Sequence, residues 1–330
     1  MPIPTSPSRP LLRREFLARW FPSAVVAALL AADAAALLAL FADRWWVFDV
    51  IANFAVQICL AQLAGVVLCL WGQRWVPAFA SLPVLLVTLW PIAGYYLPVA
   101  SAQAATGPAT LRVMTLNLWG RNDRIDLVEA EVEAEQPDVI ALMEVTPAWR
   151  ARLSALQASY PFQHRAAPWT GSDLLLLSRL PLTDLAVAHL GVGKRSTLLA
   201  TVCPPAAGGR CLDIVTVHLE RPEGRILARV RDTHLREMAG IVRTSADRTV
   251  VLGDFNMTPW SPYFRQFLSD AGLADSARGR GVSPTWFSRW LPFGLPIDQV
   301  LVGPAITVAE RHVGADVGSD HLPVIADLSF

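Results

Sequence analysis

The first third of the chain consists of long apolar stretches, whereas the rest alternates short apolar runs with polar segments. Residues 21–42, 50–71 and 76–100 each approach the roughly 20 apolar residues that a helix needs to cross a bilayer. The first stretch carries Asp33 as its only charged residue, and the other two carry none. We therefore predict a membrane anchor over residues 1–105 with three transmembrane helices.

Alternatives to this anchor explain less of the pattern. A cleaved signal peptide accounts only for the first stretch, and a buried helical hairpin of a large soluble core is the other alternative. Asp33 has no obvious partner in the other two stretches, so we expect it at a helix contact or near the membrane interface. The anchor makes the lipid bilayer an expected partner, and no protein partner is predicted.

The charges that flank the stretches predict an orientation. Four basic residues precede the first stretch, and by the positive-inside rule they place the N-terminus in the cytoplasm. Arg74, in the second loop, agrees with this orientation, while Arg44, in the first loop, disagrees weakly. Three crossings then put residues 106–330 on the extracytoplasmic (periplasmic) side of a multi-pass inner-membrane protein. The four basic residues are Arg9, Arg13, Arg14 and Arg19.

Residues 106–330 show strand-like apolar runs between helix-period stretches. A mixture of this kind over one segment favours a single α/β domain with two packed sheets, and residues 101–108 form a short linker of small residues. The expected strands are 111–116, 138–145, 174–178, 197–202, 212–217, 249–252, 297–302, 306–311 and 324–328. The expected helices are 123–136, 147–158, 223–244 and 261–271.

Cysteine usage adds a hint about the compartment. Cys59 and Cys69 lie in the second apolar stretch and are expected to act as small apolar residues. Cys203 and Cys211 flank a turn rich in Pro and Gly between two expected strands. A hairpin there can bring the two sulfurs together, and two unpaired thiols are the alternative. Disulfides persist outside the reducing cytosol, which agrees with the predicted topology.

Composition sharpens the division into two parts. The 330 residues are 53% hydrophobic and hold 28 basic and 28 acidic side chains. Residues 1–105 hold 6 of the basic and 4 of the acidic residues, which leaves 22 and 24 for residues 106–330. The second part is thus slightly acidic and contains a single lysine, Lys194. A broad basic surface for nucleic acid is therefore not expected, although local arginines such as Arg221 and Arg225 can still contact phosphate.

Polar side chains stand where the apolar runs of the second part begin or end. Taken singly, Asn117 could be a turn former, Glu144 a surface residue and His218 a structural histidine. The segment from Gly253 to Asn256 and the Asp320-His321 pair are more specific. Together they predict an oxygen-rich pocket that also holds two imidazoles. Oxygen ligands suit Mg²⁺, and the sequence has no cysteine cluster that would indicate a thiolate zinc site. The full set is Asn117, Glu144, His218, Asp254, Asn256, Asp298, Asp320 and His321.

In these residues and their order, residues 112–330 resemble the endonuclease/exonuclease/phosphatase superfamily, as a membrane-anchored, bacterial-type member. The resemblance covers all the main motif blocks of the family and none of the membrane part. It implies a four-layer α/β sandwich of the DNase I-like kind for the catalytic domain, residues 106–330. It also implies hydrolysis of phosphate esters with a magnesium ion (Mg²⁺), or with Mn²⁺ in its place.

The resemblance also implies a role for each residue. Glu144 resembles the principal metal ligand, with Asn117 and Asp320 in the metal and phosphate shell. Asp254 and Asn256 resemble the pair that orients the nucleophile or leaving group. His321, supported by Asp298, resembles the histidine that acts on the attacking water or the scissile phosphate. His218 stands where several members place a second histidine, and the expected phosphate contacts are Asn117, Asn256 and His218.

We therefore expect a membrane-anchored, divalent-metal-dependent phosphoesterase in which a histidine and a carboxylate assist attack by water. Its substrate could be a phospholipid, a nucleic acid or a phosphorylated small molecule. The alternatives are a nuclease acting on extracytoplasmic DNA or RNA and a non-catalytic membrane binding module. One aromatic cluster, Trp286-Phe287 with Trp290 to Phe293, is expected either to line the substrate cleft or touch the bilayer, or to pack in the core.

Overall fold

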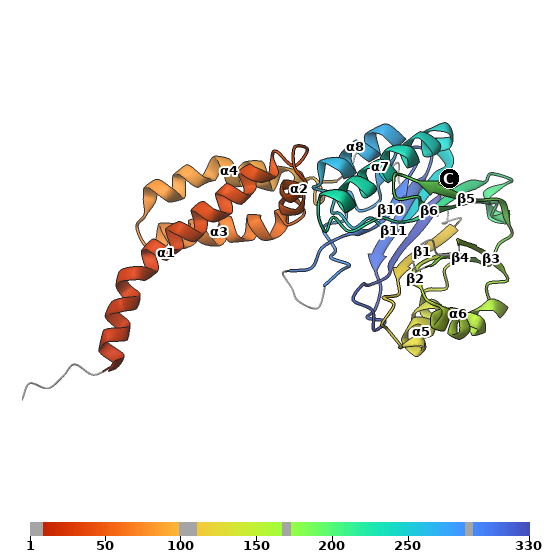
Figure 1. The fold of residues 1–330 in the computed structure, drawn as a ribbon, viewed down its shortest axis with the longest axis horizontal. Coiled ribbons are helices and arrows are strands. Elements are labelled where there is room, and N and C mark those ends of the chain that lie inside the picture. The colour runs from red at the N-terminus through yellow and green to blue at the C-terminus, as the bar shows by residue number, and fades with distance from the viewer. Residues whose placement is uncertain (1–8, 99–110, 167–172, 288–292) are drawn as a thin grey trace, which may run out of the picture. The chain divides into compact units, whose positions relative to one another are not determined.

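A computed structural model describes residues 9–98, 111–166, 173–287 and 293–330. Contacts within the chain divide it into two compact units, Met1–Ala93 and Gly94–Phe330. Figure 1 shows the first unit as a set of helices and the second as sheets covered by helices. The expected linker, residues 101–108, lies outside the described residues.

The first unit contains helices α1 (Arg9–Ala39), α2 (Trp46–Ala52), α3 (Ala55–Trp71) and α4 (Trp75–Ala93). Among the described residues, only α4 is long and apolar enough by itself to cross a membrane. The pair α2 and α3 passes the same test together but bends by 63°, and the apolar part of α1, Ser23–Ala39, is shorter. Three transmembrane helices are therefore not confirmed. At the bend, the Asp49 carbonyl accepts both the side-chain amide of Asn53 at 2.8 Å and its backbone N–H at 3.1 Å.

This unit buries several polar side chains beside its apolar ones and exposes large apolar side chains. Trp71 and Trp90 are each 80% exposed, whereas Asp33, Gln62 and Ser81 are buried. The Asp33 carboxylate accepts hydrogen bonds from the Gln62 amide at 2.8 Å and from the Ser81 hydroxyl at 2.5 Å. The expectation that Asp33 lacks a partner in the other stretches is thus wrong. Its partners are neutral amide and hydroxyl groups, which a search for an opposite charge overlooks.

The second unit contains two six-stranded sheets. Their orders are β11-β12-β1-β2-β4-β3 and β5-β6-β7-β8-β10-β9. The first sheet consists of β1 (Leu111–Asn117), β2 (Val139–Val145), β3 (Phe162–Ala166), β4 (Asp173–Ser178), β11 (Thr307–Val313) and β12 (Val324–Ser329). The second consists of β5 (Leu182–Leu190), β6 (Arg195–Val202), β7 (Leu212–His218), β8 (Thr249–Asp254), β9 (Ala274–Asp275) and β10 (Asp298–Val302). The predicted α/β fold with two sheets is confirmed.

The sheets pack face to face with helices on both outer surfaces (Figure 1). Alternate residues of the central strands, such as Val113 and Val250, form the core between the sheets. Val132 of α5 (Ile125–Glu135) and Trp149 of α6 (Pro147–Arg152) cover the first sheet. Met238 of α7 (Arg225–Val242) and Phe264 of α8 (Pro262–Ala271) cover the second. Short 3₁₀ turns η1 (Leu153–Ala158), η2 (Pro205–Ala207) and η3 (Arg243–Arg248) complete the unit.

Strand directions bring distant parts of the sequence to one end of both sheets. Strands β1 and β2 run parallel in the first sheet, as do β7 and β8 in the second. Strands β12 and β10 run antiparallel to β1 and β8, so they begin where those strands finish. We call the edge at which β1, β2, β7 and β8 finish the site end.

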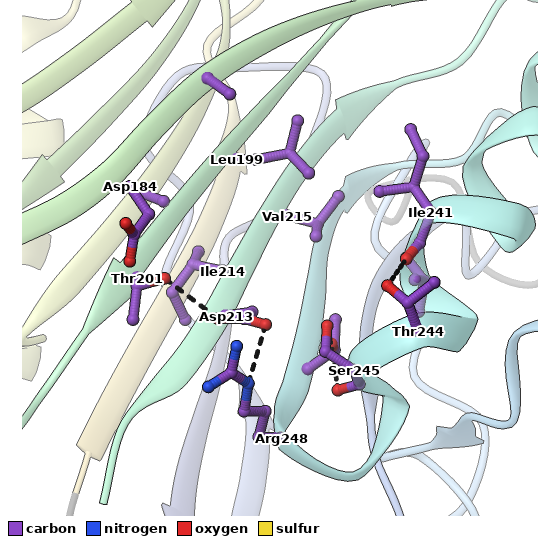
Figure 2. A pocket seen from close by; sticks show the side chains of 14 residues that line it. Asp184, Leu199, Thr201, Asp213, Ile214, Val215, Ile241, Thr244, Ser245 and Arg248 are labelled. Atoms are coloured by element: carbon purple, nitrogen blue, oxygen red, sulfur yellow. Dashed lines mark hydrogen bonds and ion pairs between the residues drawn. The ribbon is translucent and has the colours of Figure 1, made fainter. Parts of the chain in front are cut away.

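The opposite end holds the cysteine hairpin and an open groove. Cys203 and Cys211 form a disulfide between β6 and β7, so the predicted hairpin is confirmed. The groove has a volume of about 400 Å³. Figure 2 shows Thr201 and Arg248 pointing toward Asp213, whose carboxylate they reach at 3.0 and 3.1 Å. Because Asp213 lies at the start of β7, the groove is separate from the site end.

Candidate active site

All eight residues predicted for the site lie at the site end. Asn117 is the last residue of β1, Glu144 is the last residue but one of β2, and His218 and Asp254 are the last residues of β7 and β8. Asn256 follows β8, Asp298 opens β10, and Asp320 with His321 precedes β12. The parallel and antiparallel pairings explain why strand ends in the sequence become neighbours in space.

Asn117 connects the two sheets at the centre of this site. Its side-chain amide donates to Glu144 Oε1 at 3.2 Å in the first sheet and to Asp254 Oδ2 at 3.1 Å in the second. Its carbonyl oxygen accepts from the Ser319 hydroxyl at 2.7 Å, and that hydroxyl also accepts from the His321 N–H at 3.0 Å. The buried Asn117 therefore fixes the spacing between groups that come from four separate segments.

Three of the eight described non-glycine residues with positive φ lie at this site. Trp119, Glu144 and Asn256 have φ values of 56°, 57° and 48°, in a region that residues other than glycine seldom adopt. Glu144 lies where the pairing of β2 with β4 shifts register, and a bulge of this kind re-aims a side chain. Strained positions cluster at functional sites because the surrounding structure must hold them in place. The strain supports a functional role for this end of the sheets.

Glu144 is held as a carboxylate. Its Oε2 accepts from the Gly120 N–H at 3.0 Å, and the Arg221 guanidinium lies 3.5 Å from its Oε1. Burial acts to raise the pKa of Glu144, but the Gly120 N–H, the His218 ring, the Asn117 amide and Arg221 together lower it below its usual range. A carboxylate that stays ionised and remains partly accessible is suited to binding a cation.

Asp254 is fully buried between the two imidazoles. Its Oδ1 accepts from the Asn256 N–H at 2.8 Å, and its Oδ2 lies 3.5 Å from His218 Nε2 and 3.8 Å from His321 Nε2. Burial, followed by the nearby Asp298 carboxylate, raises the pKa of Asp254, and the two histidines oppose this rise. The Asn256 side chain is fixed by donating to the Leu219 carbonyl at 2.8 Å.

His321 and Asp298 form a buried pair. His321 Nδ1 lies 2.8 Å from Asp298 Oδ2, which also accepts from the Thr285 hydroxyl at 2.6 Å. Burial acts to lower the pKa of His321, but Asp298 most of all, then Asp254 and Asp320, raise it to about 9. At neutral pH the ring is therefore protonated, with Nδ1–H donating to Asp298 and Nε2–H directed toward Asp254 and Asp320.

The donor set fits a divalent cation. Four carboxylates, Glu144, Asp254, Asp298 and Asp320, converge at the site end. Asp298 Oδ1 and Asp320 Oδ1 are buried without a hydrogen-bond partner among the residues that the structure describes. One ligand atom each from Asp254, Asp298 and His321 also lie within 4.8 Å of one another, but the protonated His321 ring has no lone pair to offer, so the carboxylates are the candidate ligands. Oxygen-rich sites of this composition suit Mg²⁺ or Mn²⁺, and a cation would satisfy the unpaired oxygens.

Several contributors were not predicted from the sequence. Thr285 holds Asp298 through its hydroxyl, and the Trp286 indole N–H donates to Asp320 Oδ2 at 3.2 Å. Thr285 has no motif that marks it, whereas Trp286 belongs to the aromatic cluster whose role was open. Trp286 lies at the edge of the site and forms an isolated bridge with His321. Trp290, from the same cluster, lies outside the described residues.

Comparison with known proteins identifies the class. Residues 114–321 match the model of the Endonuclease/Exonuclease/phosphatase family, so the chain belongs to this family. It is therefore an enzyme that hydrolyses phosphate ester bonds, and the site is consistent with dependence on a divalent metal. A comparison with curated proteins found no match.

Solved structures place the fold in the same class. An endonuclease/exonuclease/phosphatase from Beutenbergia cavernae is 27% identical with a TM-score of 0.55, covering 66% of this chain and 71% of that one. A family member from Bacteroides vulgatus is 20% identical with a TM-score of 0.56, covering 66% and 98%. The 3′ phosphatase NExo from Neisseria, bound to a product DNA hairpin, is 21% identical with a TM-score of 0.53, covering 67% and 100%.

A third histidine, His234, is expected to make the second unit sensitive to acid. This ring is fully buried in α7, with Nε2 2.7 Å from the Thr197 hydroxyl. Burial, followed by Arg195 and His218, lowers the pKa of His234 to about 4 from the ordinary value of 6.5. Because the unfolded chain then binds more protons, the free energy of unfolding should fall by roughly 3 kcal/mol as the pH drops from 6.5 to 4.

Denaturant unfolding of the full chain in detergent, at several pH values, measures this effect. His234→Gln keeps a hydrogen-bonding group for Thr197 but has no proton to gain, so its stability should depend less on pH over the same interval. An equal pH dependence in the wild type and the variant would assign the acid sensitivity to other groups.

Proposed function

We propose that this protein is a membrane-anchored, divalent-metal-dependent phosphoesterase whose catalytic unit lies on the extracytoplasmic side. The observation that carries the catalytic part is the link made by Asn117 between Glu144 and Asp254, beside the buried His321–Asp298 pair. Two sheets thus contribute an ionised carboxylate, a protonated imidazole and amide donors to one small volume. These are the groups needed to bind a phosphate ester and stabilise the negative charge that develops on it.

Glu144, Asn117 and Asp320 would hold the metal ion, which when bound would polarise a phosphoryl oxygen. The protonated His321 donates from Nε2 to a phosphoryl or leaving-group oxygen, while Asp298 keeps Nδ1–H and the ring orientation fixed. The Asp254 carboxylate, held by the Asn256 N–H, is placed to accept a proton from the attacking water. His218, at the partly exposed side of Asp254, is placed to contact the phosphate.

Replacing Glu144 with glutamine tests the metal assignment. We expect the full chain in detergent to hydrolyse bis-p-nitrophenyl phosphate with Mg²⁺ or Mn²⁺. The variant should need at least about tenfold more metal for half-maximal rate, because it removes the charge of a ligand while keeping its shape. The measurement is the initial rate as a function of metal concentration.

Arg248→Ala is the matched control, because it also removes a charge but lies in the groove at the opposite end (Figure 2). Its metal dependence should equal that of the wild type. If Glu144→Gln loses thermal stability but keeps the wild-type response to metal, Glu144 is a structural residue and the assignment fails.

The anchoring part of the proposal rests on the polarity of the helical unit. A soluble bundle buries its apolar side chains, whereas here Trp71, Val76 and Trp90 are each at least 80% exposed while Asp33 and Gln62 are buried. Lipid is the solvent in which this arrangement is stable, because polar contacts then hold the helices together. The disulfide between Cys203 and Cys211 favours an oxidising compartment for the catalytic unit.

The orientation predicts the behaviour of a reporter fused after Phe330. Alkaline phosphatase, which needs an oxidising compartment, should be active there in an expressing bacterium, and green fluorescent protein exported in unfolded form should be dark. The same two reporters placed before Arg9 should give the reverse result. Fluorescence at the C-terminus without phosphatase activity would overturn the topology.

A nuclease that acts on extracytoplasmic DNA or RNA is the second candidate. It is favoured by the similarity to the Neisseria 3′ phosphatase, whose structure holds a product DNA hairpin. The slight acidic excess of residues 106–330 and their single lysine argue against a broad nucleic-acid surface. Rates on single-stranded DNA, double-stranded DNA, phospholipid and inositol phosphates, measured with one preparation, rank the substrates.

A further inference from the structure

Several of the most exposed apolar side chains of the second unit lie at its site end. In the described part of this unit, the large apolar side chains with the greatest exposure are Ile226 at 79%, Tyr96 at 63%, Phe293 at 62% and Val192 at 61%. Strand pairing places Val192 in the turn before β6, whose first residues pair with the last residues of β7. Ile226 is the second residue of α7, which follows β7. Val192 and Ile226 therefore both lie at the site end, near His218, the last residue of β7.

Val192 and Ile226 belong to one continuous surface. The Val192 N–H donates to the Thr233 hydroxyl of α7 at 3.1 Å, which fixes the turn against that helix. A Cβ on Gly193 would come within 2.5 Å of Val230, so this turn also packs closely on the helix residue one turn after Ile226. The outward-facing side chains of residues 192–194 and of the first two turns of α7 thus form one solvent-exposed surface.

Basic residues accompany these apolar side chains. Lys194, Arg225 and Arg229 are exposed, and Arg229 lies on the same helix face as Arg225 and Ile226 because it follows them by four and three residues. Lys194 is the only lysine of the chain. We call Val192, Lys194, Arg225, Ile226 and Arg229 the apolar–basic patch. Glu223 is an exposed acid beside it, so the patch is positive as a whole.

A second apolar element borders the site itself. Trp286 forms isolated bridges with Leu295 and with His321, so it lies beside the proposed catalytic histidine. Phe287, which follows Trp286, and Phe293, which precedes Leu295 by two residues, are exposed. The Phe287 ring packs edge-on against Trp286, whose N–H is bonded to Asp320. The exposed Phe287 ring therefore lies beside the group that holds Asp320, and Phe293 is two residues before Leu295, the bridge partner of Trp286.

We propose that the site end contacts the surface of an anionic lipid bilayer through the apolar–basic patch, Phe287 and Phe293, and takes its substrate, a lipid-borne phosphate ester, from that surface. Apolar side chains between Lys and Arg are the composition that binds an anionic interface, since the apolar groups enter the headgroup region and the cations pair with phosphates. The apolar exterior of the chain's own helices makes lipid, rather than a soluble protein, the favoured occupant. The substrate half of this inference rests on the proposed phosphoesterase function.

Cysteine labelling tests the contact without any assay of catalysis. The described free cysteines, Cys59 and Cys69, are buried, and Cys203 and Cys211 are paired, so an introduced cysteine can be labelled selectively with the polarity-sensitive dye NBD. Three variants of the full chain are compared, Ile226→Cys, Phe293→Cys and the control Leu185→Cys. Each is placed in nanodiscs of phosphatidylcholine, with and without phosphatidylglycerol. Leu185 is 48% exposed and lies in β5 near its opposite end, where Leu182 pairs with Val202.

The expected result is a blue-shifted, brighter emission at positions 226 and 293 than at 185, and a further increase at 226 when phosphatidylglycerol is present. Water-like emission at all three positions in both lipid compositions would overturn the contact. If position 185 gives the same blue shift as positions 226 and 293, the contact is not specific to the site end, and the inference also fails.

Hydrolysis in the same nanodiscs tests the substrate class. The double variant Ile226→Ser/Phe293→Ser should lower the ratio of phospholipid hydrolysis to bis-p-nitrophenyl phosphate hydrolysis by about tenfold, and Leu185→Ser should leave this ratio unchanged. Wild-type protein that hydrolyses the soluble ester but no phospholipid would overturn the lipid substrate and leave the phosphoesterase intact. Wild-type protein as inactive as His321→Ala on the soluble ester would instead overturn the proposed function.

Discussion

Replacing His321 with alanine is expected to lower kcat for bis-p-nitrophenyl phosphate by about 1,000-fold, because a positioned proton donor in the transition state contributes on this scale. The side chain is 1% exposed, and Asp298 holds it at 2.8 Å in the protonated form that donates from Nε2. The measurement is kcat at saturating Mg²⁺ with the full chain in detergent.

Asp298→Asn removes the negative charge from the His321–Asp298 pair but keeps a side chain of the same size. Asp298 is the main cause of the raised pKa of His321, so the amide should lower that pKa and reduce kcat while leaving KM nearly unchanged. His218→Ala should have a smaller effect than His321→Ala, because His218 lies 3.5 Å from Asp254 at the more open side of the site. A kcat for His321→Ala within about threefold of the wild type, with the fold intact, would remove this histidine from the mechanism.

Gly253→Ala is expected to be the most destabilising single substitution discussed for the second unit, with a loss of more than about 4 kcal/mol in the free energy of unfolding. Gly253 has a φ of 149°, and a Cβ on it would lie 1.8 Å from the Val217 carbonyl oxygen of the neighbouring strand β7. The parallel pair β7 and β8 would have to separate next to His218 and Asp254. Denaturant unfolding and the yield of folded protein measure the loss.

Gly240→Ala is the matched control. Gly240 is exposed in α7, and a Cβ there would meet nothing within 4 Å, so the alanine should stabilise the helix by up to about 1 kcal/mol. If both glycine variants unfold at the same denaturant concentration as the wild type, the close approach of Gly253 to Val217 does not constrain the fold.

The two-sheet fold could be predicted where strands are buried. The runs that became β1, β2, β7 and β8 are continuous and apolar because both faces of these strands are covered. Strands β3 (Phe162–Ala166) and β5 (Leu182–Leu190) were not predicted, since they lie at sheet edges with mostly exposed residues and lack a regular alternation. The order of strands was also beyond sequence reasoning, because it depends on pairings between distant segments.

The candidate site was predictable in its residue types but not in its connections. Each polar residue could be recognised because it interrupts or ends an apolar run. That Asn117 contacts both Glu144 and Asp254 depends on how the sheets pack, and no local pattern encodes it. The supporting hydroxyl of Thr285 was missed for the same reason, since it acts on Asp298 from a loop without a motif. The membrane anchor stays a prediction: among the described residues only α4, in the third expected stretch, is long and apolar enough by itself, and the first and second crossings are not confirmed.

The position of Asn117 has a consequence for how activity responds to damage elsewhere in the molecule. Its two hydrogen bonds, together with the His321–Asp298 contact, join two sheets whose shared core is apolar. A substitution that lets one sheet slide over the other by a fraction of an ångström separates Glu144 from Asp254 before either sheet unfolds. A change in the packing of the two sheets should therefore lower kcat before it lowers the melting temperature. A ligand that bridges the two carboxylates would in turn fasten the layers together and raise the stability of the whole unit.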